Sequence, residues 1–332
     1  MSDPKSSANS KQIAIAADWL QRGRTVAMPT ETVYGLAASI ESTQGIEGIF
    51  RIKRRPSFDP LIVHIHDLSQ VAGLARAWPR TAELLAARFW PGPLTIVVPK
   101  QPQVNPMITS GLDTVGIRMP RHPVALELLK STGVPLAAPS ANLFGKTSPT
   151  SADHVRSEFP EAIAKQEMLV LEGGESEVGV ESTVVSCDDN CITILRPGGV
   201  TRFELEKAVR ESGLSGIKVE SASDNNKQQS PGHTEHHYMP AQPLTVFWGT
   251  ANEISEHKRD ATGYSEITLP QDGVLAARKL YAALREADKT SSERGLILYR
   301  EVSNRDAMDL WLAIDDRLKR AARHHLGKTP WS

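Results

Sequence analysis

Short apolar runs of strand length recur through the first 210 residues and constrain the fold most strongly. Residues 24–27, 61–65 and 94–98 are three of them, and amphipathic helical spacing fills the intervals between such runs. Alternation of this kind predicts a mixed α/β domain, because each sheet face needs helices to cover it. Helices are expected over residues 13–22, over 46–55 ending before Pro56, and over 68–89 with an interruption at Pro79. No internal repeat is evident.

Polar residues follow the first of these runs at Pro29-Thr30-Glu31-Thr32-Val33-Tyr34-Gly35. Pro29 lacks a backbone donor and ends the strand ladder. The turn then presents two hydroxyls, a carboxylate and a phenol, and Gly35 allows close approach of a ligand or another backbone. A helix-capping box is the alternative interpretation of the Thr-x-x-Glu type of spacing. Similar polar ends on later strands favour a functional site.

Three further clusters of polar residues also favour a functional site. Lys53-Arg54-Arg55 precede Pro56, which fits either an anion site or an ordinary basic helix terminus. His64 and Arg118 lie in apolar strands, where a hydrogen-bonded core histidine and a structural ion pair are the alternatives. The hydroxyl-rich loop 139–150 could wrap phosphates but lacks the order of a P-loop, and surface filler remains its simpler interpretation.

Length and composition indicate two domains. The chain has 332 residues, is 40% hydrophobic, and carries 38 Lys+Arg against 39 Asp+Glu, a balance that gives no overall attraction for nucleic acid. Two cysteines are too few for a disulfide scaffold, and they flank residues 188–190, which are expected to form the tip of a hairpin between strands at 181–185 and 192–195. The expected organisation is a disordered N-terminus (1–11), a catalytic α/β domain (12–215), a polar linker (216–243) and a second α/β domain (244–332). No signal peptide or membrane-length apolar run is visible, so a cytoplasmic protein without membrane contact is expected.

The last 90 residues suggest strands at 244–248 and 296–299 and a helix over 274–288. A long final helix is expected over 306–325, with Arg317, Lys319, Arg320 and Arg323 on a solvated basic face. Weak RNA binding by this basic face is an alternative interpretation. Three histidines in the linker, His233, His236 and His237, lack the carboxylate or cysteine frame of a metal site, so no metal site is expected there.

The separate motifs occur in one order across residues 12–210 and together resemble a known family. They are Pro29–Leu36, Lys53–Pro56 with Pro60–His64, Phe89–Thr95, Gly116–Pro120, Pro139–Asn142, Ser148–Thr150, Glu181–Val185 and Leu195–Gly198. The chain resembles the YrdC-like threonylcarbamoyl-AMP synthases in their long, two-domain form. The resemblance implies a twisted mixed sheet with flanking helices and a large concave cavity, plus a smaller Rossmann-like C-terminal α/β domain.

The same resemblance implies a reaction. L-Threonine, bicarbonate and ATP would give threonylcarbamoyl-adenylate and pyrophosphate, with Mg²⁺ held mainly by phosphate oxygens and water. Separate tRNA threonylcarbamoyl-transferase proteins would then use the product to modify tRNA. The expected L-threonine residues are Thr32, His64, Arg118, Ala138 and Ser182. The expected ATP residues are Lys53, Arg55, Asp59, Thr114, Ser140, Ser148, Arg196, His237 and Tyr238, with Lys53 and Arg55 also assigned to catalysis. The linker would act as a lid through His237 and Tyr238.

Two departures from the family pattern matter. Asp59 stands where the family often carries asparagine, and the linker core His233–His236 lacks the usual basic residues. The main alternative function is a double-stranded RNA or tRNA-binding module without adenylate synthesis. Carbamoyl transfer within a larger hydrogenase-maturation protein, and nucleotide binding without turnover, are two others. The first of these two would need zinc-finger cysteines in addition to the two that the chain has.

Overall fold

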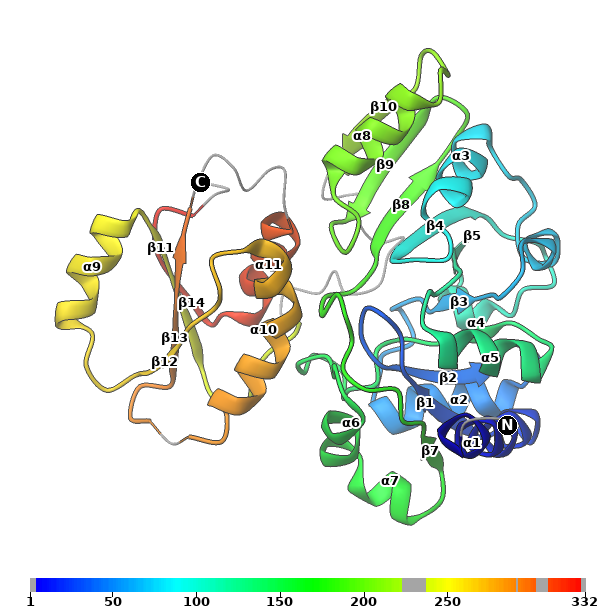
Figure 1. The fold of residues 1–332 in the computed structure, drawn as a ribbon, viewed down its shortest axis with the longest axis horizontal. Helices are drawn as coiled ribbons and strands as arrows, with labels where there is room; N and C mark the ends of the chain where they lie inside the picture. Colours follow the sequence, from blue (N-terminus) through cyan, green and yellow to red (C-terminus); the bar gives the residue numbers. More distant parts are fainter. Residues whose placement is uncertain (1–3, 223–236, 291, 303–309, 330–332) are drawn as a thin grey trace.

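A computed structural model of the chain describes residues 4–222, 237–290, 292–302 and 310–329. These residues form two α/β lobes, each built on its own sheet (Figure 1). The first lobe contains a ten-stranded sheet and the second a four-stranded sheet. The expected mixed α/β class with a smaller second domain is confirmed.

The first sheet is mixed. Its strands, in spatial order, are β10 (Lys218–Ser221), β9 (Cys191–Arg196), β8 (Thr183–Cys187), β4 (Leu94–Pro99), β5 (Thr114–Arg118), β3 (Ile62–His64), β6 (Leu136–Ala137), β2 (Gly35–Ser39), β1 (Thr25–Met28) and β7 (Met168–Val170). β3 pairs in parallel with β5, and His64 lies opposite Arg118 in that register. β8 and β9 form an antiparallel hairpin, as their sequence predicts. β10 joins β9, so the sheet of the first lobe continues past residue 215.

Helices cover this sheet. They are α1 (Pro4–Gln21), α2 (Thr43–Lys53), the 3-10 helix η1 (Leu68–Gly73), α3 (Arg80–Phe89), α4 (Pro106–Thr109), α5 (Pro123–Thr132), α6 (Ala152–Glu158), α7 (Pro160–Ala164) and α8 (Arg202–Glu211). α1 begins at Pro4, where the missing N–H costs nothing, so residues 4–11, expected to be disordered, belong to the helix that was expected from residue 13. The segment expected as one interrupted helix contains η1 and α3, joined by non-helical residues 74–79.

The end of α2 places the basic cluster. Ser42 caps its first turn by accepting from the Gly45 N–H, and Arg54 ends it in a left-handed conformation with φ of 50°. The last helical residue is Lys53, three positions before Pro56, as Pro56 predicts. The chain therefore reverses between Lys53 and Arg55, and both side chains are buried.

The second lobe has a parallel sheet. Its strand order is β12 (Ser265–Ile267), β13 (Leu296–Glu301), β11 (Leu244–Gly249) and β14 (His324–Gly327). Its helices are α9 (Ala251–Asp260), α10 (Gly273–Ala287) and α11 (Trp311–Ala321). Figure 1 shows α10 and α11 on the side of this sheet that faces the first lobe, with α9 on the far side.

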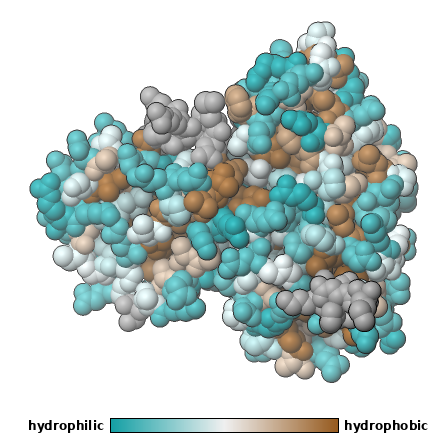
Figure 2. Space-filling view, in the orientation of Figure 1, coloured by the Kyte–Doolittle hydropathy of each residue, from teal (hydrophilic) through white to brown (hydrophobic). Residues whose placement is uncertain are grey.

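The two lobes share apolar packing. Val33 and Val180 of the first lobe and Tyr238 of the linker belong to the same buried cluster as Leu280 and Leu318 of the second. Figure 2 shows apolar residues gathered along the crease between the lobes. Gly179 packs so closely on α10 that an added Cβ would lie 2.4 Å from the Cα of Arg278. The lobes therefore meet through a fitted interface.

The prediction for the final helix is wrong in two respects. Its described part spans Trp311–Ala321, and the chain then enters β14, while residues 303–309 lie outside the described residues. Arg317 is only 1% exposed, so the solvated basic face does not include it. Lys319 and Arg323 are exposed, and Arg320 is half-buried against Asp316. Among the described residues, no helix is long and apolar enough to cross a membrane.

Candidate active site

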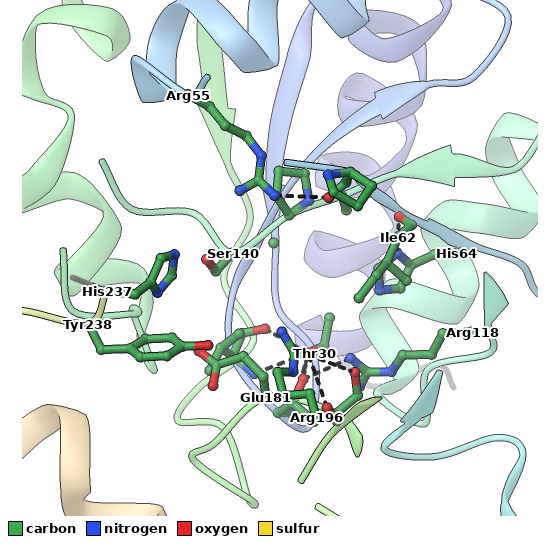
Figure 3. Close-up of a pocket in the computed structure, with 17 residues that line it drawn as sticks. Thr30, Arg55, Ile62, His64, Arg118, Ser140, Glu181, Arg196, His237 and Tyr238 are labelled. Atoms are coloured by element: carbon green, nitrogen blue, oxygen red, sulfur yellow. Dashed lines mark hydrogen bonds between the residues drawn. The ribbon is translucent and has the colours of Figure 1, made fainter. Parts of the chain in front are cut away.

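A hollow of about 550 Å³, partly open to solvent, lies in the first lobe beneath residues 237–238 of the linker (Figure 3). Ten of the fourteen predicted site residues line it. They are Thr32, Arg55, His64, Arg118, Ala138, Ser140, Ser182, Arg196, His237 and Tyr238. Figure 3 shows Arg55 at one end and Arg118 with His64 at the other.

The remaining four residues surround this hollow. Lys53 lies behind its wall, with Nζ 2.6 Å from the Ser140 carbonyl and 2.5 Å from that of Asn142. Asp59 pairs with Arg55, and Ser148 donates to Glu181 at 2.6 Å. Thr114 lines a smaller hollow next to the first, with which it shares Pro60 and Ile62. The site residues predicted from the sequence therefore lie in one connected region.

Arg118 is anchored within the wall of the hollow. Nε donates to the Gly92 carbonyl at 3.2 Å, Nη1 to Thr32 Oγ1 at 2.9 Å and Nη2 to Glu31 Oε1 at 2.7 Å. Burial alone would raise the pKa of Glu31, but the Arg118 charge and its hydrogen bonds lower it overall. The ion-pair alternative for Arg118 is therefore present in the structure. These three bonds use three of the five guanidinium N–H groups.

His64 lies beside this pair on β3, and its side chain is buried. Burial and the nearby Arg118 charge lower its pKa to about 3. The imidazole is therefore neutral near pH 7, with one donor and one acceptor nitrogen. Its Nδ1 lies 3.3 Å from the Ile62 carbonyl.

The opposite end of the hollow is cationic. Arg55 Nη2 lies 2.9 Å from Asp59 Oδ2, and Nε donates to the Asp59 carbonyl at 3.1 Å. Burial lowers the pKa of Arg55, and Asp59 partly offsets this effect. Burial and the Arg55 charge hold the pKa of Lys53 well below its ordinary value. A bound anion nearby would raise the pKa of both groups back toward their ordinary values.

A third side of the hollow comes from β8 and β9. Arg196 Nη2 donates to the Ser182 carbonyl at 3.0 Å, and Ser182 Oγ lies 2.8 Å from Thr95 Oγ1. Gly198 permits this closeness, because a Cβ there would lie 2.4 Å from the Glu181 oxygen and the Ser182 carbon. The turn after β9 therefore locks the segment that precedes β8.

His237 and Tyr238 close the hollow from the linker side (Figure 3). The next residue, Met239, bonds to the hydroxyl-rich loop through its N–H and the Gly145 carbonyl at 2.8 Å. The His237 ring packs edge-on against Phe144 and Tyr238. Burial and the surrounding cations, Arg55 first, keep its pKa well below 6.5, so the ring is neutral. Of the expected lid, 216–243, residues 223–236 lie outside the described residues.

Comparison with known proteins decides the family. Residues 18–198 match a family model of Sua5, YciO and YrdC proteins described as "Telomere recombination", and residues 200–323 match "Threonylcarbamoyl-AMP synthase, C-terminal domain". The threonylcarbamoyl-AMP synthase of Bacillus subtilis is 45% identical over 296 residues, covering 87% of this chain and 84% of the relative. That of Pyrococcus abyssi is 37% identical, covering 96% of each. The chain belongs to the threonylcarbamoyl-AMP synthase family.

A solved structure supports the same assignment. The crystal structure of Pyrococcus abyssi Sua5 complexed with L-threonine matches with a TM-score of 0.83 and 36% identity, covering 96% of each chain. The likeness includes both lobes. The chain is thus an enzyme of threonylcarbamoyl-AMP synthesis, and the RNA-binding module without this activity is not favoured.

Sequence reasoning missed several residues of this synthase site. Thr30 and Glu181 line the hollow, although the sequence singled out only their neighbours Thr32 and Ser182. Thr30 Oγ1 lies 2.8 Å from Thr32 Oγ1 and also donates to the Val33 carbonyl, which shapes the turn. Both residues lie inside motifs that resemble the family, so motif membership was the available signal. Tyr281, in the segment 280–285 that resembles the family's second domain, and Arg317 reach Glu181 from the second lobe, and neither was expected at the site.

A divalent cation held by the protein needs several ligand side chains. Among the described residues, no group of three or more His, Cys, Asp or Glu side chains is placed to hold a metal. Glu181 in the lining of the hollow and Glu31 behind Arg118 are each paired with arginine. The described residues therefore do not fit a protein-held metal site.

Proposed function

We propose that this synthase forms threonylcarbamoyl-AMP in the described hollow from L-threonine, bicarbonate and ATP, with pyrophosphate as the second product. The observation that carries the proposal is the division of the hollow into a cationic end at Arg55 and an end at Arg118 and His64 suited to an amino acid. The relative from Pyrococcus abyssi was solved with L-threonine, which supports the amino-acid assignment.

The amino-acid end has the donors that threonine requires. The two further N–H groups of Arg118 provide a charge-assisted fork for its carboxylate. Thr32 and the neutral His64 offer polar partners for the amine or hydroxyl, and Ala138 leaves room for a small side chain. Ser182 completes the wall near the site of carbamate formation.

The nucleotide end suits a polyanion. Arg55 lines it, Ser140 contributes a hydroxyl between the two ends, and Arg196 reaches the phosphates from the third side of the hollow in this proposal. Thr114 in the adjoining hollow lies where the nucleoside portion would extend. Lys53 and Ser148 support this end from behind, Lys53 by fixing the carbonyls of Ser140 and Asn142. Asp59 orients Arg55 and does not contact the nucleotide in this proposal.

The chemistry requires positioning and charge neutralisation. The threonine amine attacks the carbon of bicarbonate, and loss of water gives a carbamate. A carbamate oxygen then attacks the α-phosphorus of ATP, and the bond to the β-phosphate breaks to release pyrophosphate. Holding two anions in line accounts for much of such catalysis. His237 and Tyr238 exclude water that would hydrolyse the product.

Mg²⁺ belongs to the proposal only as a companion of ATP, held by phosphate oxygens and water. The product passes to transferase proteins that modify tRNA, and the reaction takes place in the cytoplasm. Weak RNA binding is confined in this proposal to the exposed Lys319 and Arg323.

The direct test is identification of the product by mass spectrometry. The full chain is incubated with the three substrates, and threonylcarbamoyl-adenylate is quantified beside pyrophosphate. We expect equal amounts of both. Pyrophosphate without the adenylate would overturn the proposal. A parallel reaction with L-serine reports whether the pocket requires the threonine methyl group.

A further inference from the structure

A buried carboxylate joins the two lobes next to the site. Glu181 lines the hollow and is 6% exposed. Arg317 Nε of α11 donates to its Oε2 at 2.9 Å, and the Tyr281 hydroxyl of α10 lies 3.0 and 2.9 Å from its two oxygens. Ser148 of the first lobe donates to Oε1 at 2.6 Å. Two of the three side chains on this carboxylate therefore come from the second lobe.

The second lobe supplies the largest compensation of this charge. Arg196 and Ser148 of the first lobe also lower the pKa of Glu181, but the Arg317 charge has the largest lowering effect. A buried carboxylate needs a partner charge and hydrogen bonds to stay ionised. Arg317 supplies the ion pair to Glu181 across a sequence separation of 136 residues. The second lobe thus stabilises the ionised form of a residue in the wall of the site.

The same two side chains hold other parts of that wall. Arg317 Nη1 donates to the Pro197 carbonyl, in the turn that packs on Glu181 and Ser182. Its guanidinium carbon lies 5.6 Å from the centre of the Tyr238 ring, and the Tyr281 ring stacks on Tyr238 at 5.8 Å. Tyr238 in turn lines the hollow. One cluster therefore fixes both the segment before β8 and the closing tyrosine.

We propose that Arg317 and Tyr281 are positioning residues for the amino-acid side of the site, acting through the Glu181 carboxylate and the Tyr238 ring. The second lobe is then a working part of the site, because its two side chains set the shape and charge of a wall they do not themselves form. This inference rests on the proposed binding of L-threonine in the hollow.

The inference predicts that removal of Arg317 makes the site sensitive to pH. The charged and titratable groups around Glu181 are Arg317 from α11, Tyr281 from α10, Tyr238 from the linker and Arg196 from β9, and Asp316 of α11 lies beside Arg317. Burial alone would raise the pKa of Glu181, and Arg317 is the largest influence that lowers it. Without Arg317, Glu181 takes up a proton at higher pH, and a protonated Glu181 cannot hold the wall in the same way.

The experiment measures L-threonine binding to the full chain by calorimetry between pH 5.5 and 8. The variants are Arg317→Met, Tyr281→Phe and the double variant Arg317→Met with Glu181→Gln. The matched control is Arg300→Met, which removes another buried arginine of the second lobe, paired with Asp315 and away from the hollow. Unfolding temperatures are recorded for every variant.

We expect Tyr281→Phe to weaken L-threonine binding about tenfold, the effect of losing a hydrogen bond to a charged group, with the aromatic stack kept. Arg317→Met should weaken it at least as much at pH 6 and less at pH 8, while the unmodified chain shows no such trend. In the double variant this pH dependence should vanish, because glutamine does not titrate. Arg300→Met should keep the affinity within about twofold despite a lower unfolding temperature.

Equal affinities in the Tyr281→Phe variant and the unmodified chain would overturn the inference. So would an equal loss in Arg300→Met, which would point to general destabilisation of the lobe. If Arg317→Met does not fold, Tyr281→Phe decides the matter alone, because it removes only one oxygen. Absence of L-threonine binding by the unmodified chain would instead refute the proposed function, and the inference with it.

Discussion

Single residues show how the site combines structural and chemical demands. Arg118 was predicted either to grip a ligand carboxylate or to form a structural pair, and the structure has the pair with Glu31. The two roles are compatible, because a guanidinium has five donors in a fixed fork. The ion pair with Glu31 orients the guanidinium through Nη2, and Thr32 holds it through Nη1. A lysine in this place would keep the charge and lose the geometry.

Arg118→Lys should therefore raise the dissociation constant for L-threonine about tenfold or more, equivalent to about 1.4 kcal/mol, and leave ATP affinity within about twofold. Calorimetric titration with each ligand measures both. Arg121→Lys is the matched control, since Arg121 follows closely in sequence but is exposed and pairs with Glu177 on the surface. Similar losses for both ligands would contradict the assignment of Arg118 to threonine.

His64 links the site to pH. Its pKa is lowered from 6.5 to about 3 in the folded chain. Between these values the unfolded chain binds a proton that the folded chain does not, so folding stability falls as the pH falls through this window. For a single group the slope is at most about 1.4 kcal/mol per pH unit.

His64→Gln should remove this contribution. Urea unfolding at pH 7, 5.5 and 4.5 should show a smaller acid loss in the variant than in the unmodified chain. Parallel losses would mean that His64 does not carry the effect and that carboxylates such as Glu31, whose pKa is also lowered, carry it instead.

At the scale of elements, the turn after β9 positions the wall of the site. Residues 196–199 cross directly over the start of β8, and Gly198 lies against the Glu181 and Ser182 backbone. No other residue type fits there without moving one of the two segments. The sequence identified both segments as motifs, but their contact depends on the antiparallel register of β8 and β9, which local patterns do not specify.

Gly198→Ala should destabilise the protein by about 1–3 kcal/mol, as overpacking does, and weaken L-threonine binding by displacing Ser182. Gly73→Ala is the control, because a Cβ there meets nothing within 4 Å. Chemical unfolding and L-threonine titration measure the two effects. A Gly198→Ala variant with unchanged affinity would show that the turn does not set the wall.

Element boundaries also show what the sequence could and could not predict. The end of α2 before Pro56 and the β8–β9 hairpin follow from local chemistry, and both are confirmed. The final helix was expected too long, and Arg317 was expected in solvent. The charge of Arg317 suggested a solvent-exposed side chain. In the structure Arg317 pairs with Glu181, which lies 136 residues earlier in the sequence. Pairings of that separation arise only in the folded chain.

At the scale of the whole molecule, two lobes with separate sheets share one site. The first lobe has its own core, with residues such as Ile96, Ile117 and Val185 fully buried. The second lobe adds the partners of Glu181, and Arg285 donates to the Thr147 carbonyl and pairs with Glu158. The sequence predicted the division into two α/β units, but it gave no reason to place side chains of the second domain next to the site.

A chain ending at Ala222 should fold and work poorly. It keeps the ten-stranded sheet and its core, but it lacks Tyr238, Tyr281 and Arg317. Cooperative thermal unfolding with retained far-ultraviolet circular dichroism would establish the fold, and adenylate formation at saturating ATP would report the activity. We expect a loss of about tenfold or more, because two charge-assisted contacts to Glu181 disappear. Full activity in this short chain would contradict a working role for the second lobe.

The central claim is that one hollow joins an amino acid, bicarbonate and ATP. Its most direct test is pyrophosphate release by the full chain with all three substrates and with each omitted in turn. The account predicts release only in the complete mixture, with the background rate in all three omissions. Release that continues without L-threonine or without bicarbonate would contradict it.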